Sequence, residues 1–254
     1  MIVDTLANAS INITLFIFVV FFVKGIESNH NKKYTPSYWI SIKKHDIKLL
    51  LWGIIISLFY KISVGSIGVI SGTMVVTVDQ SGMTKFIIFI LASSFGFLGV
   101  ALFEEGLYRG YLMQVLFKKL PIFLAIVLQA LIFGLIHYPH YSVQPHTWVK
   151  IIDAMLIGLI FGVIVIKTKS LMFVIGTHLF YNVTEQILFV DNPYKSTRLI
   201  CFKNSNVLSS SLLGGLFYTE FIELIILSII ALSLIFLFRK DILYKKTEKC
   251  FLNN

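Results

Sequence analysis

The feature that most constrains the fold is a series of apolar runs, several of which approach the roughly 20 residues that a helix needs to cross a bilayer. Hydrophobic residues make up 57% of the 254 residues, which is too apolar a composition for a soluble core of this length. We therefore expect an all-α, polytopic membrane protein with about seven transmembrane helices, within a range of about six to eight. The expected spans cover residues 6–24, 47–78, 86–117, 121–138, 147–167, 170–190 and 220–238.

The second span admits two interpretations, because its apolar character continues past Lys61 as far as Val78. It can be one tilted span with an interfacial segment, or two short spans. The distribution of positive charge favours one span. With seven spans, one side of the membrane carries the basic residues at 24, 32, 33, 43, 44, 48, 118, 119, 167, 169, 239, 240, 245, 246 and 249. The other side carries only those at 85, 150, 195, 198 and 203. This bias predicts an outside N-terminus and a cytoplasmic C-terminus.

The basic excess of 22 Lys and Arg over 13 Asp and Glu does not indicate a nucleic-acid partner. The basic residues lie at the ends of apolar runs, and the chain has no basic stripe, RNA-binding fingerprint or zinc finger. The expected surroundings are a lipid bilayer in the cell membrane. We divide the chain into N-terminal spans with a basic loop (1–85), a core with the polar motifs (86–190), and a loop, last span and basic tail (191–254). Residues 191–219 are expected to form a solvated external connection.

Charged residues interrupt the third apolar run at Glu104, Glu105 and Arg109. A charge at bilayer depth costs about 3 kcal/mol on insertion scales, so such a cluster needs partners and usually has a function. Glu105 and Arg109 are four residues apart with the acid first, which favours an ion pair on one helix face. Glu104 lies about 100° around the helix, so it is the acid without a partner in this pattern, and the question is what it faces.

Further polar residues occur in two other apolar runs. His137 follows Phe133 by four residues, and His178 and Asn182 share one face of their helix because they are also four residues apart. A lone intramembrane histidine is often only a hydrogen-bonded packing residue. Three helices that each present such groups predict a common site.

An acid, two histidines and an amide can hydrolyse a peptide bond without a covalent intermediate. A carboxylate can accept a proton from water and donate it later, and a histidine can share that water. An asparagine and a second histidine can bind the oxyanion that develops on the peptide carbonyl. The chain has no G-x-S-x-G sequence, no cysteine near a histidine and no H-E-x-x-H helix. No cofactor is required by this chemistry, but Glu104, His137 and His178 also form a candidate zinc-ligand set.

These motifs resemble those of the CAAX protease and bacteriocin-processing family of intramembrane endopeptidases, which includes the Abi proteins. The resemblance covers residues 86–190 and rests on E-E-x-x-x-R at Glu104, F-x-x-x-H at Phe133 and H-x-x-x-N at His178. It implies that Glu104 and His137 activate water, and that His178 and Asn182 stabilise the oxyanion. Glu105, Arg109 and Phe133 then have supporting roles. Family members have been described both as metalloproteases and as metal-independent glutamate proteases. The implied substrate is a membrane-associated peptide or a lipidated protein, in peptide-pheromone or bacteriocin maturation or in self-immunity.

Two other functions remain open at this point. A non-catalytic immunity or scaffold protein that binds a bacteriocin or a partner membrane protein would need the fold but not Glu104. A proton-coupled carrier would use the same intramembrane acid. The carrier is disfavoured because the sequence shows no inverted repeat and no pair of broken helices.

Overall fold

The structure, a computed structural model, describes residues 10–11, 13–17, 43–78, 83–143, 146–189, 200–204 and 219–243. Within these residues, five helical segments are long and apolar enough to cross a membrane. They cover Lys44–Ile70, Phe86–Phe117, Ile122–Tyr141, Thr147–Thr168 and Phe221–Lys240. The expected all-α, multi-pass membrane protein is thereby confirmed. The count of seven spans stays a prediction. Most of the first span, 6–24, lies outside the described residues, and the helix within the sixth, 170–190, is not among these five segments.

The ambiguous second run contains one continuous helix, α2 (Lys44–Ile70). A turn follows in which Gly72 has a φ of 75°, in the left-handed region that glycine adopts without strain. The chain then forms strand β1 (Met74–Val78) and not a further helix. Residues 62–78 therefore do not form a separate short span.

Strand β1 pairs antiparallel with β2 (Ile200–Asn204), so that Met74 lies opposite Asn204. This small sheet was not predicted. It also corrects the expectation that residues 191–219 only form a solvated connection, because β2 lies inside that segment. Within strand β2, the side chain of Cys201 is buried.

The acidic motif lies on the longest helical segment. Helix α3 (Met83–Glu105) continues into the π-helical segment η1 (Gly106–Leu112) and then into α4 (Met113–Phe117). In a π-helix the hydrogen bonds run from residue i to i+5, which widens the turn, and short π segments are frequent at functional sites. The predicted third span, 86–117, is thus one segment whose geometry changes directly after the two glutamates.

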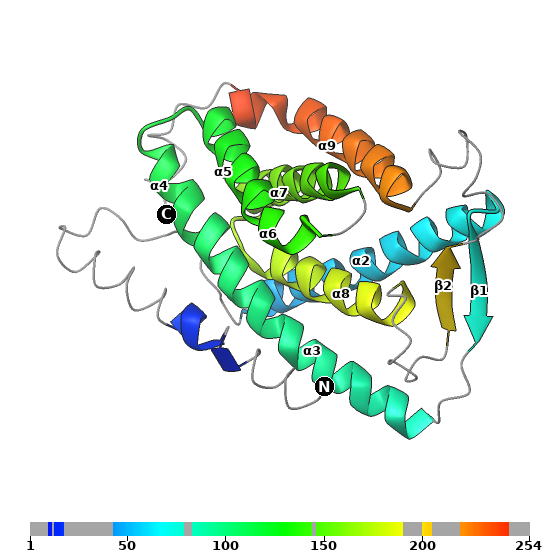
Figure 1. Ribbon diagram of the computed structural model, residues 1–254. Helices are drawn as coiled ribbons and strands as arrows, with labels where there is room; N and C mark the ends of the chain where they lie inside the picture. The colour runs from blue at the N-terminus through cyan, green and yellow to red at the C-terminus, as the bar shows by residue number, and fades with distance from the viewer. Residues whose placement is uncertain are drawn as a thin grey trace.

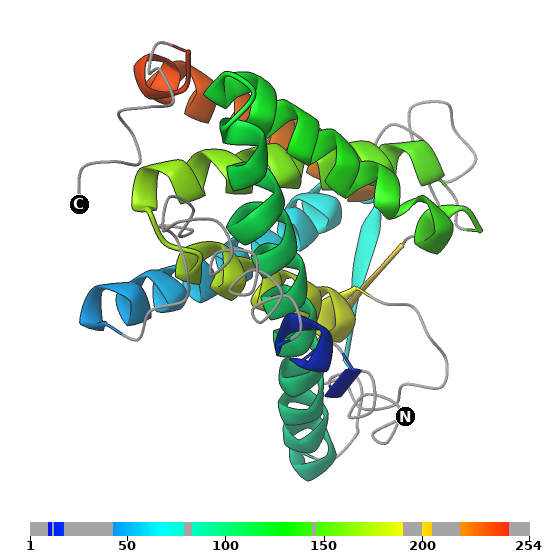
Figure 2. The ribbon, with the colours of Figure 1, turned by 90° about the vertical axis from the view of Figure 1, so that its left-hand side faces the viewer.

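The remaining helices form two groups (Figures 1 and 2). Helix α8 (Met172–Leu188) packs against α2 and α3, whereas α7 (Thr147–Thr168) packs against α5 (Ile122–Ile136) and α9 (Thr219–Leu243). Short helix α6 (Tyr138–Tyr141) follows α5. The η1 segment contacts both α5 and α7, so the motif lies where the two groups meet.

Glycines allow the close helix approaches within each group. A Cβ atom on Gly176 of α8 would collide with the backbone oxygen of Leu50 on α2. A Cβ atom on Gly134 of α5 would collide with the Met155 side chain and lie 2.9 Å from the oxygen of Ile151, both on α7. Small residues at such positions let helix backbones approach closely, as expected for packing inside a membrane.

Candidate active site

Three of the predicted site residues come together from three helices. Glu104 lies near the end of α3, His137 in the turn after α5, and His178 in the middle of α8. The Nε2 atom of His137 lies 3.8 Å from Oε2 of Glu104, and the Nε2 atom of His178 lies 3.9 Å from the same oxygen. This oxygen is buried and has no hydrogen-bond partner within the described part of the chain. Two imidazole rings therefore flank one carboxylate oxygen without bonding to it directly.

Glu105 is fully buried and holds this arrangement together. Its Oε1 atom accepts a hydrogen bond of 3.1 Å from the Arg109 guanidinium, as the four-residue spacing predicts. The same oxygen lies 2.8 Å from Nδ1 of His178. This second contact was not predicted from the sequence. Glu105 thus connects α3 to α8 and sets the direction of the His178 ring.

Aromatic rings enclose the charged end of Arg109. The guanidinium carbon lies 4.2 Å from the centre of the Phe133 ring and 5.4 Å from that of Phe161. A cation over an aromatic face gains up to about 2 kcal/mol when it is desolvated. Phe133 also makes an edge contact with Tyr108 at 5.1 Å between ring centres. The F-x-x-x-H motif therefore supplies both a wall for Arg109 and, one turn later, His137.

His137 is oriented by the backbone of its own helix. Its Nδ1 atom lies 2.6 Å from the carbonyl oxygen of Phe133. Because a carbonyl only accepts hydrogen bonds, Nδ1 must carry the proton. In the neutral ring, Nε2 then has a free lone pair, and this is the atom that faces Glu104. The same reasoning applies to His178, because ionised Glu105 also only accepts hydrogen bonds.

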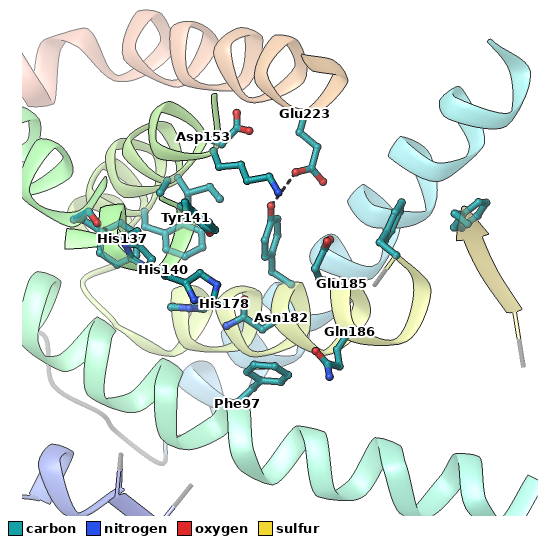
Figure 3. Close-up of a pocket in the computed structure, with 18 of the residues that line it drawn as sticks. Phe97, His137, His140, Tyr141, Asp153, His178, Asn182, Glu185, Gln186 and Glu223 are labelled. Atoms are coloured by element: carbon teal, nitrogen blue, oxygen red, sulfur yellow. Dashed lines mark hydrogen bonds between the residues drawn. The ribbon is translucent and has the colours of Figure 1, made fainter. Parts of the chain in front are cut away.

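A cavity of about 630 Å³ opens beside these residues (Figure 3). His137, His178 and Asn182 line it, and Phe97, Phe133 and Phe161 give it apolar walls. Asn182 lies one helical turn after His178, so the two side chains extend from the same face of α8. Glu104 does not line the cavity itself and lies next to it, beside the two histidines.

The predicted zinc-ligand set fits poorly. Two ligand atoms that each lie about 2.0–2.1 Å from a tetrahedral zinc ion are about 3.3 Å apart. The separations from Glu104 to the two histidines are 3.8 and 3.9 Å. Within the described residues, no group of three His, Cys, Asp or Glu side chains is arranged to hold a metal ion. We therefore derive no step through a metal.

A second polar cluster at the other end of the cavity was missed. The ammonium group of Lys61, which is 1% exposed, lies 2.7 Å from Oε2 of Glu185 and 2.5 Å from Oε1 of Glu223. The hydroxyl of Tyr181 donates to the other oxygen of Glu223 at 3.1 Å. These contacts join α2, α8 and α9. The available signal was a charged residue inside each of three apolar runs, at Lys61, Glu185 and Glu223, and the sequence alone assigned none of them a role.

The two histidines between α5 and α7, His140 and His146, lie in different places. His140 lines the cavity from α6. His146 precedes α7 in a left-handed conformation, and its ring lies against Phe221 of α9 at 5.7 Å between centres. Neither contact connects these two residues to Glu104.

Comparison with known proteins supports the resemblance seen in the motifs. A family model described as type II CAAX prenyl endopeptidase Rce1-like matches residues 85–184. The matched segment agrees closely with the expected 86–190 and includes every predicted site residue. No curated protein and no solved structure matches the chain significantly.

Proposed function

From the family match over residues 85–184, we propose that this chain is an intramembrane endopeptidase that hydrolyses a peptide bond with water activated by Glu104 and His137. The match indicates an intramembrane protease, and the residue roles are our proposal. The observation that carries the proposal is the convergence of two histidines, from separate helices, on one buried carboxylate oxygen of Glu104.

Glu104 acts as the general base in this mechanism. A water molecule between Glu104 and His137 donates one proton to the carboxylate and is oriented by the free lone pair of His137 Nε2. The water oxygen attacks the carbonyl carbon of the peptide bond to form a tetrahedral oxyanion. Glu104 then returns the proton to the leaving amine as the carbon–nitrogen bond breaks. The Glu104 side chain is 21% exposed, and the two histidines beside it line the cavity from which the water would come.

Asn182 and His178 stabilise the oxyanion. The Asn182 side-chain amide donates a hydrogen bond without any change of charge. His178 can donate from Nε2 only when both ring nitrogens carry protons, because its Nδ1 proton is already directed at Glu105. In that form the Nδ1–H group donates to Oε1 of Glu105, which leaves the Nε2–H group for the oxyanion. Glu105 therefore supports catalysis through His178 in addition to its ion pair with Arg109.

The lining of the cavity is compatible with a peptide substrate. It combines aromatic and aliphatic side chains with histidine, carboxylate and amide groups, so it offers both apolar surface and hydrogen-bonding groups. A membrane-associated peptide or a lipidated protein can reach such a site from the bilayer. The biological roles that fit such a substrate are the maturation of a peptide pheromone or bacteriocin, and self-immunity.

The proposal is tested by cleavage in a purified system. The protein in liposomes is incubated with a set of internally quenched, membrane-associated peptides, and products are identified by mass spectrometry. Glu104→Ala and His137→Ala should remove nearly all cleavage, whereas His146→Ala, on the loop before α7, should retain it. Wild-type rates in either of the first two variants would show that the mechanism is assigned wrongly.

A further inference from the structure

The cavity continues from the proposed catalytic residues along one face of α8. His178, Asn182 and Glu185 follow one another at spacings of four and three residues, so they share a helix face, and all three line the cavity (Figure 3). At 1.5 Å per residue, Glu185 lies about 10 Å along the helix axis from His178. The substrate chain that reaches the catalytic residues can therefore also reach Glu185.

Glu185 differs from the other carboxylates here in its exposure. Its side chain is 44% exposed, whereas that of Glu223 is 11% exposed. One oxygen of Glu185 contacts the buried Lys61 ammonium at 2.7 Å. Lys61 thus anchors the carboxylate from behind while much of it stays open to the cavity.

Carboxylates outnumber ammonium groups among the described residues that line the cavity. The carboxylates are those of Asp153, Glu185 and Glu223, and the lining also includes Lys150. The ammonium group of Lys61 contacts Glu185 and Glu223. A positively charged group on the substrate would meet the exposed part of Glu185 here.

Apolar surface suited to a long basic side chain lies beside Glu185. The rings of Phe189 and Phe202 line the cavity and stack on each other at 5.3 Å between centres. The methylene stem of a lysine or arginine can lie along such rings while its charged end reaches a carboxylate.

We propose that Glu185 is a specificity-determining residue that binds a lysine or arginine side chain of the peptide substrate. An extended chain advances about 3.3–3.6 Å per residue, so the distance of about 10 Å places this side chain about three residues from the scissile bond. This inference rests on the proposed peptidase function and specifies its substrate class.

Binding to the inactive protein tests this proposal apart from catalysis. Fluorescent nine-residue apolar peptides carry either lysine or its uncharged analogue norleucine at each position in turn. Their affinities for Glu104→Gln in detergent are measured by fluorescence anisotropy. At one position the lysine peptide should bind about tenfold more tightly, as expected for a charge-assisted contact that is partly exposed. The Glu104→Gln/Glu185→Gln protein should bind the lysine and norleucine peptides about equally. The Glu104→Gln/Glu185→Lys protein should instead bind a peptide with glutamate at that position more tightly. Lys61 keeps Glu223 as a partner in both double variants.

A carboxylate outside the cavity supplies the control. Asp46 is a buried acid in the first turn of α2, and Glu104→Gln/Asp46→Asn should keep the lysine preference. Equal binding of the two peptides, absence of binding by every peptide, or a preference that survives Glu185→Gln would overturn the proposal. If wild type leaves the same peptides intact although the inactive protein shows the lysine preference, the peptidase function fails and the subsite stands.

Discussion

The two adjacent glutamates have different surroundings, although the sequence places them side by side. Glu105 is fully buried, pairs with Arg109 and contacts His178, so it connects two helices. Glu104 is partly exposed, and its Oε2 atom has no hydrogen-bond partner among the described residues, as is also true of Oε2 of Glu105. The two acids differ in that Oε1 of fully buried Glu105 contacts both Arg109 and His178, which is typical of a structural charge. A partly exposed carboxylate flanked by two imidazole rings is instead available for chemistry.

Substitution of the two glutamates should therefore have different effects on stability and on activity. Glu105→Gln leaves buried Arg109 without its counter-charge, and breaking a buried ion pair costs about 3–5 kcal/mol in protein interiors. This variant should have a lower Tm and a lower folded yield. Glu104→Gln keeps the shape and removes an acid, so it should be folded, no less stable, and inactive. Thermal unfolding and activity of the same detergent preparations distinguish them, and the reverse pattern would mean that the two roles are exchanged.

Asn182 offers a separate test of the oxyanion contact. Removal of one donor to an oxyanion typically reduces kcat by about 10²–10³. Asn182→Ala should show this loss with little change in KM, because the contact forms only as the oxyanion develops. Steady-state kinetics on one cleaved peptide measure both constants. An increase in KM with unchanged kcat would instead assign Asn182 to substrate binding. Gln186→Ala, one residue beyond Glu185 in the cavity wall, is the matched control for loss of an amide.

At the level of elements, α8 is positioned by its contact with α2, which depends on Gly176. Gly176→Ala would force the helices apart, because the new Cβ would meet the backbone oxygen of Leu50, which cannot move aside. Overpacking of this kind typically costs about 1–3 kcal/mol, so Tm and activity should both fall.

Gly162 is the matched control for this substitution. Its Cβ would meet the ends of flexible side chains, at 3.0 Å from Ile126 Cγ2 and 3.5 Å from Met113 Sδ. Gly162→Ala should therefore be tolerated much better in the same unfolding assay. Equal effects of the two substitutions would contradict the packing described for α2 and α8.

The helices were largely predictable, because membrane spans have a strong compositional signal. The predicted span 86–117 coincides with the apolar segment Phe86–Phe117, and 147–167 differs by one residue from α7 (Thr147–Thr168). The five-residue strands β1 and β2 have no comparable signal, since their pairing depends on residues more than a hundred positions apart. The π-helical geometry of η1 was also missed, because a seven-residue π segment inside a long apolar run is too short to show a period of its own.

The site was predictable to the extent that its residues carry recognisable spacing. Glu104, His137, His178 and Asn182 follow from polar groups in apolar runs, and the structure brings the first three into one cluster with Asn182 one turn away. The contact of Glu105 with His178 spans 73 residues and could not follow from spacing within one helix. The contacts of Lys61 with Glu185 and Glu223 depend in the same way on how α2, α8 and α9 pack.

At the level of the whole molecule, the two helix groups meet at two polar sites. The contacts of η1 with α5 and α7 include the Arg109 and Phe133 pair, and the contacts of Lys61 and Tyr181 with Glu223 join α2 and α8 to α9. The cavity is lined by residues of both groups. Its two ends are therefore fixed by charged contacts, while its walls are mainly apolar.

The geometry of the whole site predicts that a metal chelator will not remove activity. Water is activated in our account by Glu104 and His137, whose separation of 3.8 Å exceeds that of two ligands on one zinc ion. Cleavage after incubation with 1,10-phenanthroline and removal of the chelator should match that of untreated protein. Loss of cleavage that zinc restores would show that the site rearranges around a metal.

Cleavage in water enriched in ¹⁸O tests the central claim most directly. The wild-type protein in liposomes should cut a membrane-associated peptide at one bond and add one ¹⁸O atom to the new carboxyl terminus, as mass spectrometry can resolve. The Glu104→Gln protein, folded to the same extent, should form no product. Label-bearing product from Glu104→Gln at the wild-type rate would contradict the assignment of Glu104 as the base, and wild-type protein that cuts none of the peptides would contradict the peptidase function itself.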